Sequence, residues 1–194
     1  MAPDGFVTPD FSRPLDVEAH VQATPEDATL KGMYFEQLRK MMAEKGLTLP
    51  GPRSYLAFRD YPLRDYQRAV ADAAKQLHPG VPLRESLRQI GRSSYRVLSS
   101  SLVGKVAFGV LGRDIPRITK LVSKAYELSV KPGKATALDI GENHSHVRLE
   151  EIYTFVDCMQ VGSFEGVFDM LGYEGQVKIK PISASSCEFY STWN

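Results

Sequence analysis

The sequence contains little cysteine, has no long uninterrupted apolar run and carries almost no net charge. Its only cysteines are Cys158 and Cys187, which excludes a small fold built on several disulfides, and we expect two free thiols. The longest apolar run, residues 101–112, contains Lys105 and is too short to cross a membrane. The 24 basic and 23 acidic residues are mostly interspersed, so neither nucleic acid nor a membrane is an expected partner.

Several enzyme signatures are also missing. The chain has no GxSxG, HExxH, P-loop or dinucleotide-binding motif, and the serines at 99–101 do not form a nucleophile elbow. The first residues lack the basic and apolar regions of a secretory signal. We therefore expect a non-enzymatic protein of the cytoplasm.

The most informative stretch is residues 83–112, which predicts one long helix. Its first half is amphipathic, with Leu87 and Ile90 on one side and Arg88 on the other. Its second half is apolar on all sides, is rich in small residues and has Lys105 as its only charge. The first half is therefore expected to cover a core with one face, and the second half to be buried on most sides.

The remaining pattern predicts helices first and strands last. Helices are expected at residues 33–46, 60–78 and 115–130, the first of them beginning either at Thr24 or after Gly32. Strands are expected at residues 135–140, 146–152, 176–182 and 187–193, with a helix at 163–171 between the two hairpins. The predicted fold class is α+β, with an N-terminal helical layer packed on a C-terminal antiparallel β-β-α-β-β unit.

Residues 1–24 predict an N-terminal arm, ahead of a single α+β domain at residues 25–194. Val17, Ala19 and Val21 alternate with polar residues, which predicts a short strand in the arm. Such an arm can dock on its own domain or reach a second subunit, and both interpretations stay open here.

Five segments, taken in order, carry a family resemblance. LKGMYFEQL, LHPGVPLRESLRQIGR, HVRLEE, GSFEGVFDMLG and FYSTW resemble a large paralogous family of uncharacterised proteins expanded in myxobacteria, over about residues 28–193. That family is distantly similar to the haem-NO-binding, vinyl-4-reductase and TRAPP-like group of folds, in which a helical layer lies over a β-β-α-β-β unit and often encloses a pocket. The resemblance implies this fold and a tendency to bind small ligands or to dimerise, and it implies no catalytic residue.

The resemblance implies no cofactor, because the ligand signatures of the relatives are missing. Haem-NO-binding domains have a proximal histidine on a helix and then a Tyr-x-Ser-x-Arg motif, whereas residues 152–157 read IYTFVD. His78 precedes a proline at a helix end, where a capping role is expected. Metal-binding vinyl-4-reductase domains use several clustered cysteines, and Cys158 and Cys187 are two ligands short of a closed zinc site.

Lys105 is the main candidate for binding a ligand, because an unpaired ammonium inside an apolar stretch is costly. It would meet a carboxylate or phosphate of a ligand at the mouth of a pocket, with Tyr95 and Phe108 as walls. We include Trp193, on the last strand, among the predicted ligand-binding residues. Alternatively, the Lys105 stem covers apolar surface while its head reaches water or an acidic partner.

Two further groups of polar residues have both a functional and a structural interpretation. His144 and His146 can lie on one side of a strand as a metal pair does, but no third ligand is evident, and histidines in a hairpin turn are usually solvated. A basic face either binds phosphate groups or an acidic partner, or is simply a solvated helix face. Its members are Arg113, Arg117, Lys120, Lys124, Lys131 and Lys134.

The sequence thus leaves two functions open. The first is a non-enzymatic sensor or signalling domain that binds a small apolar or anionic ligand next to Lys105. The alternative is a homodimeric scaffold or protein-interaction module that has no ligand. A homodimer is expected in either case. An enclosed cavity favours the first function, and an interface of more than about 1,000 Å² between two copies favours the second.

Overall fold

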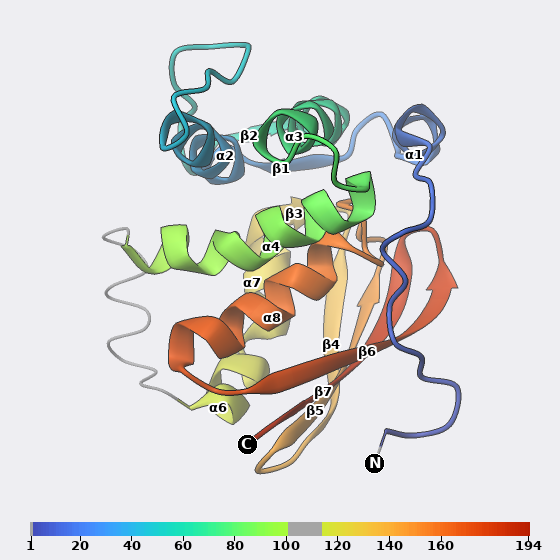
Figure 1. Ribbon diagram of the computed structural model, residues 1–194. Helices are drawn as coiled ribbons and strands as arrows, with labels where there is room; N and C mark the ends of the chain where they lie inside the picture. The colour runs from blue at the N-terminus through green and yellow to red at the C-terminus, as the bar shows by residue number, and fades with distance from the viewer. Residues whose placement is uncertain (1, 101–113) are drawn as a thin grey trace.

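A computed structural model describes residues 2–100 and 114–194, and side chains between 95 and 100 are left out of the description. The elements form an upper helical layer and a lower layer in which two crossing helices cover a sheet (Figure 1). The predicted α+β class, with helices first and a β-β-α-β-β unit last, is confirmed. None of the described helices combines the length and the apolar character that a membrane span needs.

The upper layer contains three helices and a small antiparallel sheet. The helices are α1 (Val17–Ala23), α2 (Met33–Ala43) and α3 (Leu63–Leu77), and the strands, in the order β2-β1-β3, are Asp60–Pro62, Thr29–Lys31 and Val130–Lys131. Phe35 and Leu38 of α2 pack with Tyr66 and Val70 of α3 in the core. The apolar faces of both helices follow the 3.6-residue period, which is why the sequence predicted them.

The predicted strand in the N-terminal arm is wrong, because Val17–Ala23 is the helix α1. The Asp16 carboxylate caps it by accepting a hydrogen bond from the Ala19 amide at 2.9 Å. Val17 and Val21 are four residues apart, so they satisfy a helical period as well as an alternating one, and Val21 is buried. Thr24 therefore ends a helix and does not begin one, and α2 starts after Gly32, as the other interpretation expected.

The rest of the arm docks on its own domain. Val7 exchanges backbone hydrogen bonds of 2.8 and 2.9 Å with Ile179 of the outer sheet strand β6 (Gly175–Ser183). The Phe6 ring lies against His146, with 5.3 Å between the ring centroids. The interpretation in which the arm packs on its own chain thus describes this structure.

Two helices of the lower layer cross at very short range. They are α4 (Leu83–Ser100) and α8 (Met159–Leu171), and a Cβ atom at Gly162 would lie 1.9 Å from the Arg88 carbonyl oxygen. Leu87 and Ile90 of α4 are buried, which confirms the predicted amphipathic first half of this helix. The predicted apolar second half, residues 101–112, lies outside the described residues.

The sheet of the lower layer has four antiparallel strands in the order β4-β5-β7-β6. Besides β6, they are β4 (Lys134–Ile140), β5 (His144–Glu150) and β7 (Ser186–Trp193). The strands β4 and β5 form the first predicted hairpin, and β6 and β7 form the second. α8 covers one face of this sheet, and its Phe164 ring stacks on Phe189 of β7 at 4.7 Å. Alternating side chains of β5 and β7 therefore face α8 and the interior.

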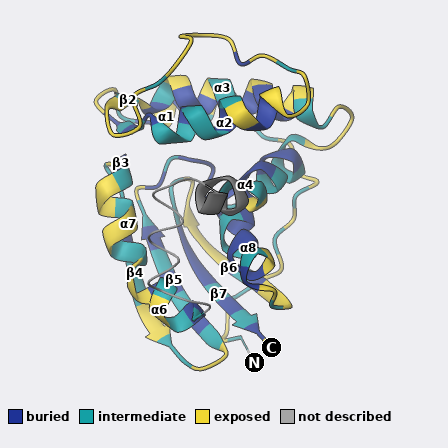
Figure 2. Cartoon of the chain, turned by 90° about the vertical axis from the view of Figure 1, so that its left-hand side faces the viewer, coloured by how far each residue is buried: buried dark blue, intermediate teal, exposed yellow. Residues whose placement is uncertain are grey.

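The helix predicted after Asp114 is divided in two at Leu121. Asp114 caps α6 (Ile115–Lys120), and α7 (Val122–Ser129) follows a break at which Leu121 is 45% exposed. Both helices run beside β4, below the upper layer (Figure 2). A continuous helical period cannot show such a break, because it contains neither glycine nor proline at that point.

Candidate functional site

A cavity of about 670 Å³ lies between the upper helices, α6 and α7, α8 and the sheet. Most of the side chains that line it are apolar, and they come from elements that are far apart in the sequence. Examples are Leu30 of β1, Met33 of α2, Ile115 of α6, Val122 of α7 and Val167 of α8. Small-molecule sites usually have this size and character.

A chain of hydrogen bonds occupies one part of the cavity wall. Tyr126 of α7 donates its hydroxyl hydrogen to Oε1 of Gln160 at 2.5 Å, and Nε2 of Gln160 donates to the Thr154 hydroxyl at 2.6 Å. All three residues line the cavity. These bonds fix the orientation of the buried Gln160 amide, so both of its polar atoms have partners within the protein.

Two buried tyrosines add to the wall. Burial raises the pKa of Tyr34 and of Tyr66, although a hydrogen bond with Ser129 acts against this shift at Tyr34. Both phenols are therefore neutral at physiological pH. They offer hydrogen-bonding hydroxyl groups to the cavity, and no negative charge.

Two serines lie opposite each other on the sheet side of the cavity. Ser145 of β5 is the direct register partner of Ser191 of β7, and they are 2% and 1% exposed. The Ser191 hydroxyl has no hydrogen-bond partner among the residues that the structure describes. Both serines line the cavity, so its most deeply buried polar groups come from the sheet.

Charged side chains are scarce along the described part of the lining. Lys31 and Lys124 are the only ones there, and no carboxylate lines it. The Lys31 ammonium lies 2.6 Å from the Asp60 carboxylate, and Lys124 is exposed on α7. The cavity interior is therefore nearly uncharged.

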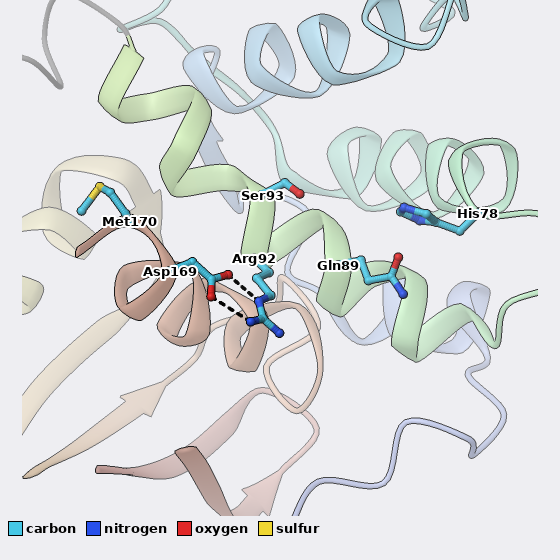
Figure 3. Close-up of a pocket in the computed structure, with 7 residues that line it drawn as sticks. His78, Gln89, Arg92, Ser93, Asp169 and Met170 are labelled. Atoms are coloured by element: carbon cyan, nitrogen blue, oxygen red, sulfur yellow. Dashed lines mark hydrogen bonds and ion pairs between the residues drawn. The ribbon is translucent and has the colours of Figure 1, made fainter. Parts of the chain in front are cut away.

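A second hollow, of about 560 Å³, lies beside α4 and α8 (Figure 3). Its two charged groups bind each other, because Arg92 donates to both oxygens of Asp169 at 2.5 and 2.8 Å. His78 lies at its edge, ends α3 as expected, and places Nδ1 2.7 Å from the Ser86 hydroxyl. The charged groups of this hollow bind each other, so the larger and mostly apolar cavity is the better candidate site.

The predicted ligand-binding residues are only partly described. Lys105 and Phe108 lie outside the described residues, and Tyr95 is described only as backbone of α4. Trp193 is buried on β7, with its ring 6.0 Å from that of Phe168, which lines the cavity. Sequence reasoning missed Tyr126, Gln160, Ser145 and Ser191. Only the two serines left a signal, as polar residues at inward positions of alternating strands.

The other predicted polar groups are mostly engaged in ion pairs. His144 Nε2 lies 2.9 Å from Asp139, and His146 Nε2 lies 3.0 Å from Glu188, on different partners. Within the described residues there is no group of three or more histidines, cysteines or carboxylates placed to hold a metal ion. In the basic face, Arg117 pairs with Asp114 and Lys131 with Asp60, while Lys120, Lys124 and Lys134 are exposed. Arg113 lies outside the description.

The profile of a family described as "Protein of unknown function (DUF2378)" matches residues 23–194. The chain belongs to this family. DUF2378 thus covers everything after the N-terminal arm and α1, including all elements that line the cavity. A search of curated proteins finds no match.

Solved structures of H-NOX proteins share the fold of this DUF2378 chain. An H-NOX protein from S. oneidensis in the Fe(II)NO state has a TM-score of 0.63 and 16% identity, covering 85% of this chain and 99% of that one. An oxygen-binding H-NOX domain related to soluble guanylate cyclases has a TM-score of 0.62 and 15% identity, and the match covers 84% of this chain and 92% of that one. A structure concerned with haem redox potential and porphyrin distortion has a TM-score of 0.61 and 15% identity, and the match covers 83% of this chain and 96% of that one. The expected likeness to haem-NO-binding domains is thereby confirmed for the fold.

The described donor groups of this cavity do not fit haem. All four histidines of the chain, at positions 20, 78, 144 and 146, are described, and none lines the cavity. Neither of the two cysteines lines it. The raised pKa values of Tyr34 and Tyr66 keep both phenols of the lining neutral, and the Tyr126 hydroxyl donates its hydrogen to Gln160. Met33 and Met159 line it, but methionine ligates haem together with histidine. This chain therefore has the H-NOX fold, and the described part of its cavity lining presents no imidazole or thiolate that could hold the iron.

Proposed function

We propose that this protein is a non-enzymatic sensor domain that binds a small molecule in the 670 Å³ cavity without haem. The observation that carries the proposal is an apolar cavity between the two layers of a fold shared with H-NOX proteins. Structures of those proteins were determined with NO and with oxygen bound. A site without histidine or cysteine ligands calls for an organic ligand held by contact and hydrogen bonds.

The chemistry of the chain supports a binding role over a catalytic one. Burial raises the pKa of Cys158 and of Cys187 to about 12, so neither thiol is a nucleophile at neutral pH. The Gln160 amide, which would otherwise orient a reacting group, is saturated by Tyr126 and Thr154. The described cavity wall thus has no general base and no activated nucleophile.

A route for the signal is built into the α4–α8 pair. α8 supplies the side chains of Phe164, Val167 and Phe168 to the cavity, so a bound molecule presses on this helix. At Gly162 the backbones of α8 and α4 are in contact, and Arg88 binds Glu165 across the crossing. A displacement of α8 is therefore passed to α4, which leads into residues 101–113 of the chain.

Binding of the neutral fluorescent probe N-phenyl-1-naphthylamine tests the proposed function. We expect saturable fluorescence enhancement at micromolar probe. Val167→Trp should weaken it at least tenfold, because Val167 is buried and lines the cavity. Ile182→Trp is the matched control, since Ile182 is 54% exposed and does not line the cavity. Absence of saturable binding, or equal binding by both variants, would refute the proposal.

Homodimerisation is a second proposal, supported by apolar side chains on one side of the molecule. Leu128 of α7 is 61% exposed, and Leu138 of β4, an outer strand of the sheet, is 44% exposed. A second copy would cover both. Light scattering over a concentration series should show a dimer that Leu138→Lys converts to a monomer, and a wild-type monomer at all concentrations would contradict this.

We also propose a cytoplasmic location for the protein and an expansion of its family in myxobacteria.

A further inference from the structure

We infer that the cavity takes a neutral, mostly apolar molecule with one hydrogen-bonding oxygen, which is held by Ser191 at the sheet. This inference rests on the proposed function, since it names the ligand class of the same cavity. It starts from the Ser191 hydroxyl, which is buried, lines the cavity and lacks a hydrogen-bond partner among the described residues.

The backbone places this hydroxyl on the interior face of the sheet. Ser191 is two residues from Phe189, and alternate residues of a strand share a face. Phe189 stacks on Phe164 of α8, so this face of β7 looks toward α8 and the cavity. Ser145 lies directly opposite Ser191 in the register, where side chains of neighbouring strands are about 5 Å apart.

Four other polar residues of the wall have hydrogen-bond partners within the protein. Gln160 and Thr154 bind each other, and the Tyr126 hydroxyl donates to Gln160. Ser163 also lines the cavity, but its hydroxyl donates to the Met159 carbonyl of its own helix at 3.2 Å. A buried hydroxyl without a partner is unfavourable, and an oxygen or nitrogen atom of a ligand would remove that penalty.

The charges around the cavity favour a neutral ligand. Asp60 already neutralises Lys31, and Lys124, the other lysine of the described lining, is exposed to solvent. An anionic group at Ser191 would be buried, and neither lysine is a buried, unpaired cation that would offset its large desolvation cost. Of the two expected ligand types, apolar and anionic, the structure therefore points to the apolar one.

Competition against N-phenyl-1-naphthylamine with three compounds of one shape tests the ligand class. The competitors are naphthalene, 2-naphthol and 2-naphthoate, which differ only in having no polar group, a neutral hydroxyl or a carboxylate. We expect 2-naphthol to compete about tenfold better than either of the others, although naphthalene is the more hydrophobic compound. Ser191→Ala should remove this preference. Ser163→Ala, the same substitution in the same cavity, should keep it.

The possible results separate the ligand class from the proposed function. If the probe binds but the three compounds compete equally, or 2-naphthoate competes best, the neutral ligand class is overturned and a small-molecule site remains. A preference for 2-naphthol that survives Ser191→Ala overturns the role of Ser191. If the probe does not bind the wild-type protein, the proposed function falls and this inference falls with it.

Discussion

Arg88 of α4 and Glu165 of α8 form a two-armed ion pair, with Nε to Oε2 at 2.7 Å and Nη2 to Oε1 at 2.9 Å. The pair lies beside the close contact between Gly162 and the Arg88 carbonyl group. Backbone contact and charge therefore hold the two helices at the same place. This arrangement joins α8, which supplies part of the cavity wall, directly to α4.

The Arg88–Glu165 pair should show strong coupling in a double-mutant cycle. Both side chains are largely shielded, at 22% and 15% exposure. Arg88→Met leaves the Glu165 carboxylate partly buried without this partner, whereas Glu165→Gln leaves Arg88 paired with Glu85. We expect Arg88→Met to lower the free energy of unfolding by about 2 kcal/mol, Glu165→Gln by about 1 kcal/mol, and the double variant by less than their sum. Urea unfolding measures all four proteins. Additive losses would contradict the coupling. Arg117→Met, in an exposed pair, should cost less than about 0.5 kcal/mol.

Gly162→Ala should destabilise the protein, although alanine favours helices more than glycine does. The added Cβ would meet the Arg88 carbonyl oxygen at 1.9 Å, and this oxygen belongs to the backbone of α4. We expect a loss of about 2 to 3 kcal/mol, as in overpacked interiors, measured by thermal or urea unfolding. Ser163→Ala is the control on the same helix. Unchanged or raised stability of Gly162→Ala would show that the helices do not approach this closely.

Ser191→Ala should raise the stability of the ligand-free protein by up to about 1 kcal/mol, because it removes a buried hydroxyl that has no partner among the described residues. Ser86→Ala provides the contrast. The Ser86 hydroxyl donates to the Ala74 carbonyl at 2.7 Å and contacts His78, so its loss should destabilise by about 1 kcal/mol. Differential scanning calorimetry compares the two variants. Equal losses at both positions would argue against an unpaired Ser191 hydroxyl.

His20 should make stability depend on pH just below neutrality. Burial lowers its pKa, although the hydrogen bond from Nε2 to the Tyr153 carbonyl, at 2.9 Å, opposes this shift. With a lower pKa in the folded state, the unfolded chain binds more protons as the pH falls below about 6.5, the ordinary histidine value. Stability is thus fully present above that pH and decreases toward the lower pKa of the folded state.

His20→Gln tests this by flattening the plot of unfolding free energy between pH 7 and pH 5. Some slope should remain, because burial also lowers the pKa of His78. An unchanged slope in His20→Gln would contradict the assignment.

The sequence was informative where one local rule decided the structure. The two hairpins, α8 and the amphipathic start of α4 each follow a single period, and Gly172, with φ of 78°, ends α8 as a left-handed cap. The arm was harder, because Val17 and Val21 fit two periods and the Asp16 cap decided between them. The break at Leu121 has no local marker, because neither glycine nor proline lies at that point.

The candidate site was less predictable than the fold, since its groups come together only in three dimensions. The hydrogen-bonded chain joins Tyr126 of α7, Thr154 of a loop and Gln160 of α8. The spacing of these residues in the sequence does not predict that they are in contact. Ser191 was within reach of sequence reasoning, because it interrupts an inward series with Phe189 and Trp193. A buried polar residue in such a series needs a hydrogen-bond partner, and the sequence does not show which group that is.

The contact between Val7 and Ile179 also affects how the edge of the sheet can pair with other molecules. β6 is an outer strand, and its free amide and carbonyl groups are a template on which a strand of another molecule can add. The two hydrogen bonds between Val7 and Ile179, one donated by each amide, occupy that template at Ile179, and the arm passes along the same side of the sheet (Figure 1). The arm, which lies outside the family match, therefore leaves less of this sheet edge free to pair with a strand of another molecule.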